Sequence, residues 1–180
     1  MDKHVPRKDI YDCYAYISNF KSGSLHLPDR DYSGPGVYHV ISCAQNFEGR
    51  RAPLFEETAL RKLIQTNWLD LPQRYPSTQL DEFVIMHDHI HFLIWPNKWP
   101  DRVPPGHPPY LYRIMQSYKS RVAVEWLNHI KRNEPDRSAK IWQAGYYERA
   151  VRIGELDRAR KYIRENPDQF FELMDWKKPF

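Results

Sequence analysis

The chain is poor in cysteine, glycine and long apolar runs, and each shortage excludes a class of protein. Its 180 residues include only 2 cysteines and 7 glycines. Cys13 and Cys43 have no CxxC spacing, which argues against a disulfide framework and a thiolate zinc site. No apolar run approaches the roughly 20 residues that span a bilayer, and the N-terminus lacks the apolar core of a signal peptide. We therefore expect a soluble, cytoplasmic protein with no membrane partner.

Positive charge is in moderate excess and is concentrated near the C-terminal end. The formal net charge is +4 at pH 7. Between positions 149 and 164, six cations stand against Glu155 and Asp157, an excess equal to that of the whole chain. The six cations are Arg149, Arg152, Arg158, Arg160, Lys161 and Arg164. Clustered cations are typical of a protein that binds a polyanion, although a solvated helix face has the same composition.

The order of chain breakers and apolar patterns predicts one α+β domain behind an arm. Residues 1–33 are polar and irregular, so we interpret them as an N-terminal arm, with a domain over 34–180 and a C-terminal tail from about 168. The predicted strands are Val37–Ala44, Glu82–Trp95 and, as a short extended piece, Ile141–Ile153. The predicted helices are Glu56–Trp68, Tyr110–Ile130 and Glu155–Glu165, the last of which ends before Pro167.

Three histidines stand at every second position of one apolar run. On a single strand, His87, His89 and His91 would share one face, because successive side chains point to opposite faces. Ile90 and Phe92 would then lie on the other face and pack into a hydrophobic core. Imidazoles that converge from a rigid strand can bind a metal ion. The alternative is a half-exposed strand that happens to be rich in histidine.

A phenol and a carboxamide stand one helical turn apart within the cationic segment. Tyr162 and Asn166 are four residues apart, so they lie nearly one above the other on a helix. A phenol has a pKa of about 10 and needs activation, which a divalent cation and guanidinium groups supply when they polarise a phosphodiester. Two imidazoles and one amide oxygen leave positions for phosphate oxygens and water. Such a set suits Mg²⁺ or Mn²⁺ better than a closed zinc site.

Four strings of the sequence resemble one family. The run from Met86 to His91 (MHDHIH) closely resembles the His-hydrophobic-His (HUH) motif of the single-tyrosine transposases, usually Met-Pro-Asn/Asp-His-Val/Ile-His. Three more strings resemble the REP-associated tyrosine transposase branch of these IS200-like proteins: residues 112–120 (YRIMQSYKS), 141–149 (IWQAGYYER) and 162–167 (YIRENP). The strings follow the order of the family from about Gly36 to Pro167.

The resemblance implies a fold and roles for particular residues. The expected fold is a ferredoxin-like α+β domain of the HUH-endonuclease type, with the histidine pair on an antiparallel sheet and the tyrosine on a separate helix. By the resemblance, His89 and His91 match the metal-binding pair, Asn166 matches the third ligand, and Tyr162 matches the nucleophile.

The resemblance also implies an activity and a partner. Members of the family cleave and rejoin single-stranded DNA beside hairpins through a 5′-phosphotyrosine, and they use no nucleotide cofactor. We therefore expect a metal-dependent transposase that acts on hairpin-bearing single-stranded DNA. We expect a bacterial protein, a monomer or homodimer, that associates with the nucleoid when it is bound to DNA.

The sequence departs from the family pattern at two places. His87 stands where the family usually has proline. Its side chain would share the ligand face of the predicted strand, but we favour a role in packing or hydrogen bonding at the edge of the site. The segment after Pro167 lacks the sequence that usually follows in the family. The resemblance therefore does not support DNA contacts by this C-terminal segment.

Several residues keep two interpretations. In one interpretation, DNA bases stack on the rings of Trp142 and Tyr147 while the nearby Arg149 and Arg152 contact phosphates. In the other, Trp142 anchors its segment to the sheet. Arg158, Lys161 and Arg164 are expected to contact phosphates beside Tyr162. Tyr118 is interpreted as core, and Tyr112 is the rival nucleophile.

Two other functions remain open at this point. The first is a domesticated protein that binds hairpin DNA without mobilising it. The second is a metallohydrolase with a histidine site, which would form no covalent intermediate.

Overall fold

The structure is a computed structural model, which describes residues 36–47, 50–51, 54–96 and 110–176. The predicted N-terminal arm, residues 1–33, lies outside the described residues. None of the described helices is both long enough and apolar enough to cross a membrane.

A four-stranded antiparallel sheet forms the centre of the domain. Its strands are β1 (Val37–Cys43), β4 (Thr78–Ile85), β5 (His89–Pro96) and β6 (Tyr147–Val151), in the spatial order β4-β5-β1-β6. Two short strands, β2 (Asn46–Phe47) and β3 (Arg50–Arg51), form a separate ribbon. The helices are η1 (Leu54–Glu56), α2 (Thr58–Leu69), α3 (Leu71–Arg74), α4 (Tyr110–Asn133), η2 (Ile153–Glu155) and α5 (Leu156–Trp176).

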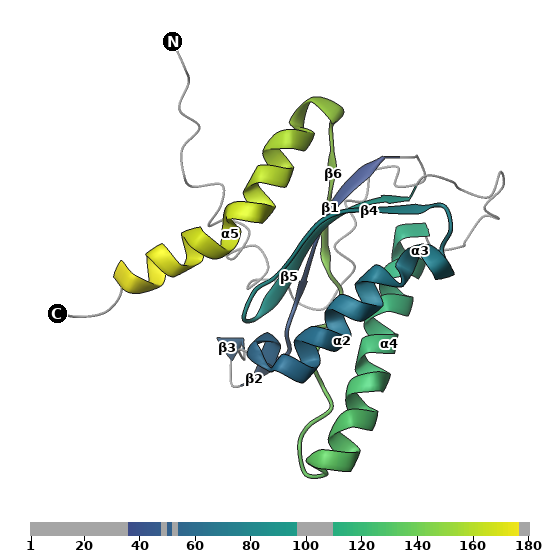
Figure 1. Ribbon diagram of the computed structural model, residues 1–180, viewed down its shortest axis with the longest axis vertical. Coiled ribbons are helices and arrows are strands. Elements are labelled where there is room, and N and C mark those ends of the chain that lie inside the picture. The colour runs from purple at the N-terminus through teal and green to yellow at the C-terminus, as the bar shows by residue number, and fades with distance from the viewer. Residues whose placement is uncertain (1–35, 48–49, 52–53, 97–109, 177–180) are drawn as a thin grey trace.

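The order of these elements makes the fold ferredoxin-like, as the sequence predicts. The principal elements follow one another as β1, α2, β4, β5, α4 and β6, which is the βαββαβ pattern of that fold. Helices α2 and α4 cover one face of the sheet, and α5 lies on the opposite side (Figure 1). The sheet therefore separates the predicted nucleophile on α5 from the main helical layer.

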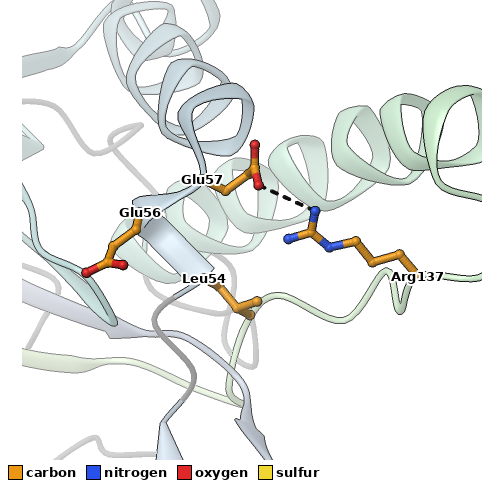
Figure 2. A pocket seen from close by; sticks show the side chains of 4 residues that line it. All are labelled: Leu54, Glu56, Glu57 and Arg137. Carbon is orange, nitrogen blue, oxygen red and sulfur yellow. Dashed lines mark ion pairs between the residues drawn. The ribbon is translucent and has the colours of Figure 1, made fainter.

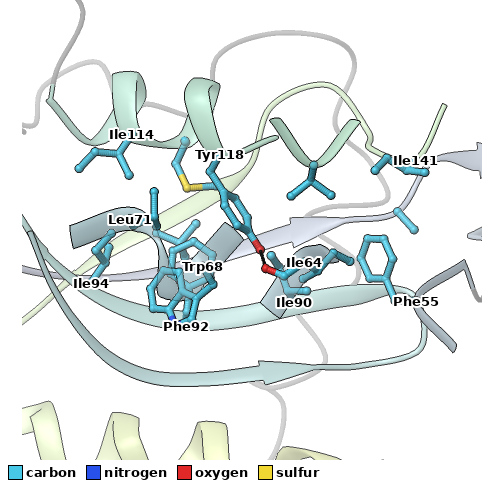
Figure 3. Packing of buried hydrophobic residues seen from close by; sticks show 14 of the residues in the cluster. Phe55, Ile64, Trp68, Leu71, Ile90, Phe92, Ile94, Ile114, Tyr118 and Ile141 are labelled. Carbon is cyan, nitrogen blue, oxygen red and sulfur yellow. Dashed lines mark hydrogen bonds between the residues drawn. The ribbon is translucent and has the colours of Figure 1, made fainter. Parts of the chain in front are cut away.

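The main hydrophobic core lies between the sheet and helices α2 and α4. The Trp68 ring stacks on Phe83 at 5.1 Å and packs against Phe92 at 4.5 Å, measured between ring centroids. Tyr118 is fully buried, and its hydroxyl donates a hydrogen bond to the Ile64 carbonyl at 3.1 Å (Figure 3). Burial raises the pKa of this phenol. Tyr118 is thus a core residue, as predicted.

A second, smaller core lies under α5. The predicted apolar stripe of this helix, Leu156, Ala159 and Ile163, packs on the sheet. Its sheet partners are Val37, Leu93 and Val151. Because β1, β5 and β6 all contribute to this core, the position of α5 over the sheet is set by packing.

One flank of α5 is also joined to the edge strand β4 by ion pairs. Arg160 donates to both carboxylate oxygens of Asp81, with its Nη2 at 2.8 Å from Oδ2, and the Trp95 indole donates to the same oxygen at 3.0 Å. Burial alone would raise the pKa of Asp81, but the hydrogen bonds from Arg160 and Trp95 outweigh it and lower that pKa. Arg164 pairs with Glu82 at 3.4 Å. These contacts attach α5 to the sheet of its own chain.

The predicted strand Glu82–Trp95 is wrong, because the structure has a hairpin there. Strand β4 ends at Ile85, β5 begins at His89, and residues 86–88 form the turn. The turn is held from outside the hairpin: Ala44 N–H donates to the Asp88 carbonyl at 2.7 Å, and Phe55 N–H donates to the His87 carbonyl at 2.9 Å. Tertiary hydrogen bonds therefore override a continuous strand pattern.

The predicted end of the last helix is also wrong. Helix α5 runs through Pro167 and ends at Trp176, after 21 residues. A proline within a helix removes one backbone hydrogen bond and causes a kink, but the residues on either side keep their own bonds. The helix therefore continues past the proline.

Candidate functional site

The predicted site residues meet on the sheet face that lies under α5. Ile41 of β1 is paired with His91 of β5, and His39 is paired with Leu93. Since cross-strand partners share a face, His39 lies on the same face as His91. The Tyr162 ring approaches from α5, with its centroid 5.9 Å from that of His91 and 6.0 Å from that of His39. Three separate elements thus bring a phenol and two imidazoles together.

His91 lies between two polar side chains. Its Nε2 is 3.1 Å from the Asn166 amide nitrogen, and its Nδ1 is 3.1 Å from Nε2 of His39. Only 3% of His91 and 7% of His39 is exposed, so these contacts are largely shielded from water. The structure therefore joins Asn166, one turn beyond Tyr162, to the histidine strand.

His89 is held by its neighbour in the sequence. Its Nδ1 is 2.5 Å from the Asp88 carboxylate, and both residues are buried. The ring centroids of His89 and His91 are 4.6 Å apart. The contact with Asp88 occupies Nδ1 of His89, so Nε2 is the nitrogen of this ring that could bind a metal ion.

The cations of the C-terminal segment are divided between two sides of α5. Arg158 lies one turn before Tyr162 and shares its helix face, whereas Arg164 pairs with Glu82 on the opposite flank. Arg149 lies opposite His39 on β6 and pairs with Glu155 at 3.7 Å. Lys161 is 3.8 Å from Glu165, and Arg152 is exposed. Exposed ion pairs are weak, so Arg149 and Lys161 can exchange a carboxylate for a phosphate.

Of the two aromatic residues predicted to contact DNA, only one lies on the site face. Tyr147 is half-buried opposite Ile41, on the same side as His91. The Trp142 ring contacts Phe55 at 5.0 Å, its indole N–H donates to the Lys119 carbonyl at 3.2 Å, and it packs against the main core. These contacts favour the interpretation that Trp142 anchors its segment to the body.

A sequence profile of the family described as "Transposase IS200 like" matches residues 36–166. The chain belongs to the IS200-like transposase family. The matched range begins one residue before β1 and ends at Asn166, so it contains both histidines of the pair and Tyr162.

Two relatives extend this result. The structure of a REP-associated tyrosine transposase bound to a REP hairpin aligns with a TM-score of 0.55 and 18% sequence identity, over 81% of this chain and 74% of that one. At this identity the likeness supports the fold. A Haemophilus influenzae protein described as uncharacterized is 28% identical over 75 residues, which are 39% of this chain and 42% of that protein. The chain thus matches less than half the length of this relative.

Burial keeps the imidazoles of His39 and His91 neutral. It lowers the pKa of His39 from 6.5 to about 4, with a smaller contribution from the nearby Arg149 charge. Burial, with smaller contributions from His89 and His39, holds the pKa of His91 well below its usual value. A neutral imidazole is the form that binds a metal ion.

These shifts predict acid sensitivity in metal-free protein. A histidine whose pKa is lower in the folded state is protonated first in the unfolded chain, so stability falls as the pH drops below about 6.5. Arg149 from β6, His91 from β5 and Tyr162 from α5 face His39. From pH 7 to pH 5 we expect a loss of about 2 kcal/mol from His39, measured by chemical denaturation in chelator. Stability that is constant over this range would contradict the prediction.

His87 does not share the strand face of the other two histidines, contrary to the sequence prediction. It lies in the turn between β4 and β5, where side chains do not follow the strand alternation. Its Nε2 is 3.5 Å from the Asp88 carboxylate, and its ring centroid is 6.4 Å from that of His89. The structure thus places His87 beside Asp88, at the edge of the histidine pair.

The rival nucleophile lies on the other side of the sheet. Tyr112 belongs to α4, which covers the face opposite α5, and 36% of it is exposed. The sheet therefore separates its hydroxyl from His89 and His91.

Two residues of the site were not selected from the sequence as functional. His39 stands in the middle of a predicted strand, and Asp88 stands within the HUH string. Asp88 could have been selected, because a carboxylate beside a histidine ligand often orients it. His39 gives no such local signal, because its role depends on which strand lies next to β1.

A surface pocket of about 420 Å³ is lined by residues other than those of the site. It is lined by Leu54, Glu56, Glu57 and Arg137, with Glu57 and Arg137 paired at 3.5 Å (Figure 2). Its two carboxylates do not suit a polyanion such as DNA. None of the predicted site residues lines it.

The donor set fits a divalent metal ion only if the amide takes part. Within the described residues, no group of three or more histidine, cysteine, aspartate or glutamate side chains is placed to hold a metal. His89, His91 and Asn166 instead provide two imidazoles and one amide. Asp88 and His39 contact the two Nδ1 atoms, so a metal ion would bind at Nε2 of both rings, where the Asn166 amide nitrogen contacts His91 in the structure.

Proposed function

We propose that this transposase cleaves and rejoins single-stranded DNA beside hairpins, through a covalent bond between Tyr162 and a DNA 5′-phosphate. Mg²⁺ or Mn²⁺ would be held by His89, His91 and Asn166. One arrangement carries the proposal, which is that two residues of α5 meet the same histidine. The ring centroid of Tyr162 is 5.9 Å from that of His91, and the Asn166 amide nitrogen is 3.1 Å from Nε2 of His91.

The chemistry assigns separate tasks to the residues on α5. The phenolic oxygen of Tyr162 attacks phosphorus and loses its proton, the bond from phosphorus to the 3′ oxygen breaks, and that oxygen takes up a proton to become a 3′-hydroxyl. A bound divalent cation would polarise the phosphate and stabilise its charge. Arg158, on the same helix face, is placed to orient a phosphate. Rejoining is the reverse attack by a 3′-hydroxyl, so phosphodiester bonds are conserved and no nucleotide cofactor is needed.

Two further features support DNA as the substrate. Arg149 on β6 and Arg158 on α5 belong to the elements that carry the site face, the exposed Arg152 directly follows β6, and Tyr147 adds an aromatic ring on β6. The REP-associated transposase of similar fold was solved with a REP hairpin bound. A hairpin with a single-stranded flank is therefore the first substrate to test.

The proposal is tested by incubating the protein with labelled single strands that carry hairpins, in Mg²⁺ or Mn²⁺, and running a denaturing gel. We expect a labelled protein band that disappears with chelator, and no such band with blunt duplex. Cleavage without the band would favour a metallohydrolase. Binding without cleavage would favour a domesticated DNA-binding protein.

Salt dependence tests the role of the α5 cations. Each phosphate contact contributes about −0.7 to the slope of log affinity against log salt for single strands. We expect Arg158→Ala to weaken binding and to reduce that slope by roughly 0.7, because Arg158 shares the helix face of Tyr162. Fluorescence anisotropy in chelator, where no cleavage occurs, provides the measurement.

Arg164→Ala is the matched control for this experiment. Arg164 is also exposed on α5, but it pairs with Glu82 on the other flank of the helix. Its removal is expected to change the slope less than the removal of Arg158. Equal losses in the two variants would show that the helix face does not decide which cation contacts DNA.

A further inference from the structure

We propose that His39 is a positioning residue, which selects the tautomer of His91 that binds the metal ion. This inference rests on the proposed metal site, and it adds a residue that the sequence analysis did not select. His39 reaches the site from β1 and touches His91 at Nδ1, on the side of the ring away from Asn166.

The contact between the two histidines requires a division of roles. Their nitrogens are 3.1 Å apart, and a neutral imidazole has one N–H and one acceptor nitrogen, so one ring donates and the other accepts. The Asn166 amide nitrogen lies 3.1 Å from Nε2 of His91, which makes Nε2 an acceptor. The proton of His91 is therefore on Nδ1, and it is donated to Nε2 of His39.

This arrangement prepares His91 for a metal ion. A ligand nitrogen must present a lone pair, and the same tautomer that donates to His39 leaves the lone pair on Nε2. Because only 3% of His91 is exposed, water is a poor substitute for the acceptor that His39 provides. Without that acceptor, the buried N–H would lose its hydrogen bond, and the opposite tautomer would compete.

The two histidines of the pair are thus oriented by different chemical groups. His89 has its Nδ1 against the carboxylate of Asp88, whereas His91 has its Nδ1 against the imidazole of His39. Ligating histidines usually donate their second N–H to a carboxylate, a carbonyl or water. An imidazole on the neighbouring strand provides the same acceptor, in a ring whose plane lies 25° from that of His91, with centroids 5.3 Å apart.

The experiment measures the tautomer of His91 and the affinity of the protein for Mn²⁺ in two separate assays. Long-range ¹H–¹⁵N spectra of metal-free protein near pH 7.5 report which nitrogen of His91 carries the proton, and calorimetric titration with Mn²⁺ alone gives the affinity. In wild type we expect the proton on Nδ1. In His39→Leu we expect more of the Nε2–H form and an affinity about 10 to 100 times weaker, the usual effect of losing such a partner.

Two further variants separate positioning from packing. His39→Gln carries an amide oxygen that can occupy the place of Nε2, so it is expected to restore most of the tautomer and of the affinity. Ile41→Val changes the residue paired with His91 without altering its hydrogen bond, and it should behave as wild type in both measurements.

The outcomes distinguish this inference from the proposed function. A wild-type His91 with its proton on Nε2, a His39→Leu protein with unchanged tautomer and affinity, or equal losses in the Leu and Gln variants would each overturn the role of His39. If neither wild type nor any variant binds Mn²⁺, but the tautomer of His91 still changes with the residue at position 39, the positioning role of His39 stands and the proposed metal site fails.

Discussion

The Tyr162→Phe variant is expected to form no covalent DNA adduct. Its rate of DNA cleavage should fall by about three orders of magnitude or more, as in other enzymes that lose their nucleophile. The substitution removes one oxygen atom. The ring keeps its edge contacts with His39 and His91 and its packing beside the core under α5. Folding and DNA affinity should therefore be retained. Denaturing gels quantify the adduct, and mass spectrometry of trapped wild type maps it.

Tyr112→Phe is the matched control, because it deletes the same atom on the opposite side of the sheet. It should cleave DNA as wild type does. An adduct mapped to Tyr112, or cleavage that persists in Tyr162→Phe, would show that the nucleophile has been assigned to the wrong residue.

Elements with strong local periodicity could be predicted from the sequence. The stripe of α5, Leu156, Ala159 and Ile163, recurs at helical spacing and is buried against the sheet. The same spacing places Tyr162 and Asn166 one turn apart, and the structure brings both toward His91. Such features depend only on residues within two turns of one another, so one sequence is sufficient to find them.

The turn before β5 could not be predicted in this way. Alternation continues through residues 86–88, and His87 stands at the position where a proline would have marked a break. The structure forms the turn because Ala44 and Phe55 donate backbone hydrogen bonds to it. Those donors are the residue that follows β1 and a residue of η1, so the signal for the turn is not local.

The same reason explains why His39 was not found. A histidine in an apolar strand is interpreted as a core residue unless the residues that face it from the neighbouring strand are known. The pairing of β1 with β5 places it diagonally across from His91, and burial among these strands lowers its pKa to about 4. Strand order is a property of the whole fold, which composition and periodicity do not determine.

The cationic segment shows how packing divides a charge cluster that looks uniform in sequence. Arg160 and Arg164 face the edge strand and pair with Asp81 and Glu82. Arg158 lies on the other side of the helix, with Tyr162. Part of the positive excess therefore holds α5 on the sheet, and Arg158 remains on the exposed face that it shares with Tyr162.

His91→Ala is expected to weaken Mn²⁺ binding more than about 100-fold, because loss of an outer partner alone costs 10- to 100-fold. The variant removes one of two imidazole ligands and leaves a gap between Asn166 and His39, so cleavage should fall with metal affinity. Calorimetric titration with Mn²⁺ measures the first effect, and the adduct assay measures the second. Full metal-dependent cleavage by this variant would remove His91 from the metal site.

His87→Ala is the control that tests whether this effect is specific. Both variants delete an imidazole from the same short segment, but His87 lies in the turn, with its ring 6.4 Å from His89 and beside the Asp88 carboxylate. We expect His87→Ala to bind Mn²⁺ within about tenfold of wild type, the lower limit for the loss of an outer partner. If it lost as much affinity as His91→Ala, a third imidazole would belong to the metal site, and the turn would have to bring His87 toward the pair when the ion binds.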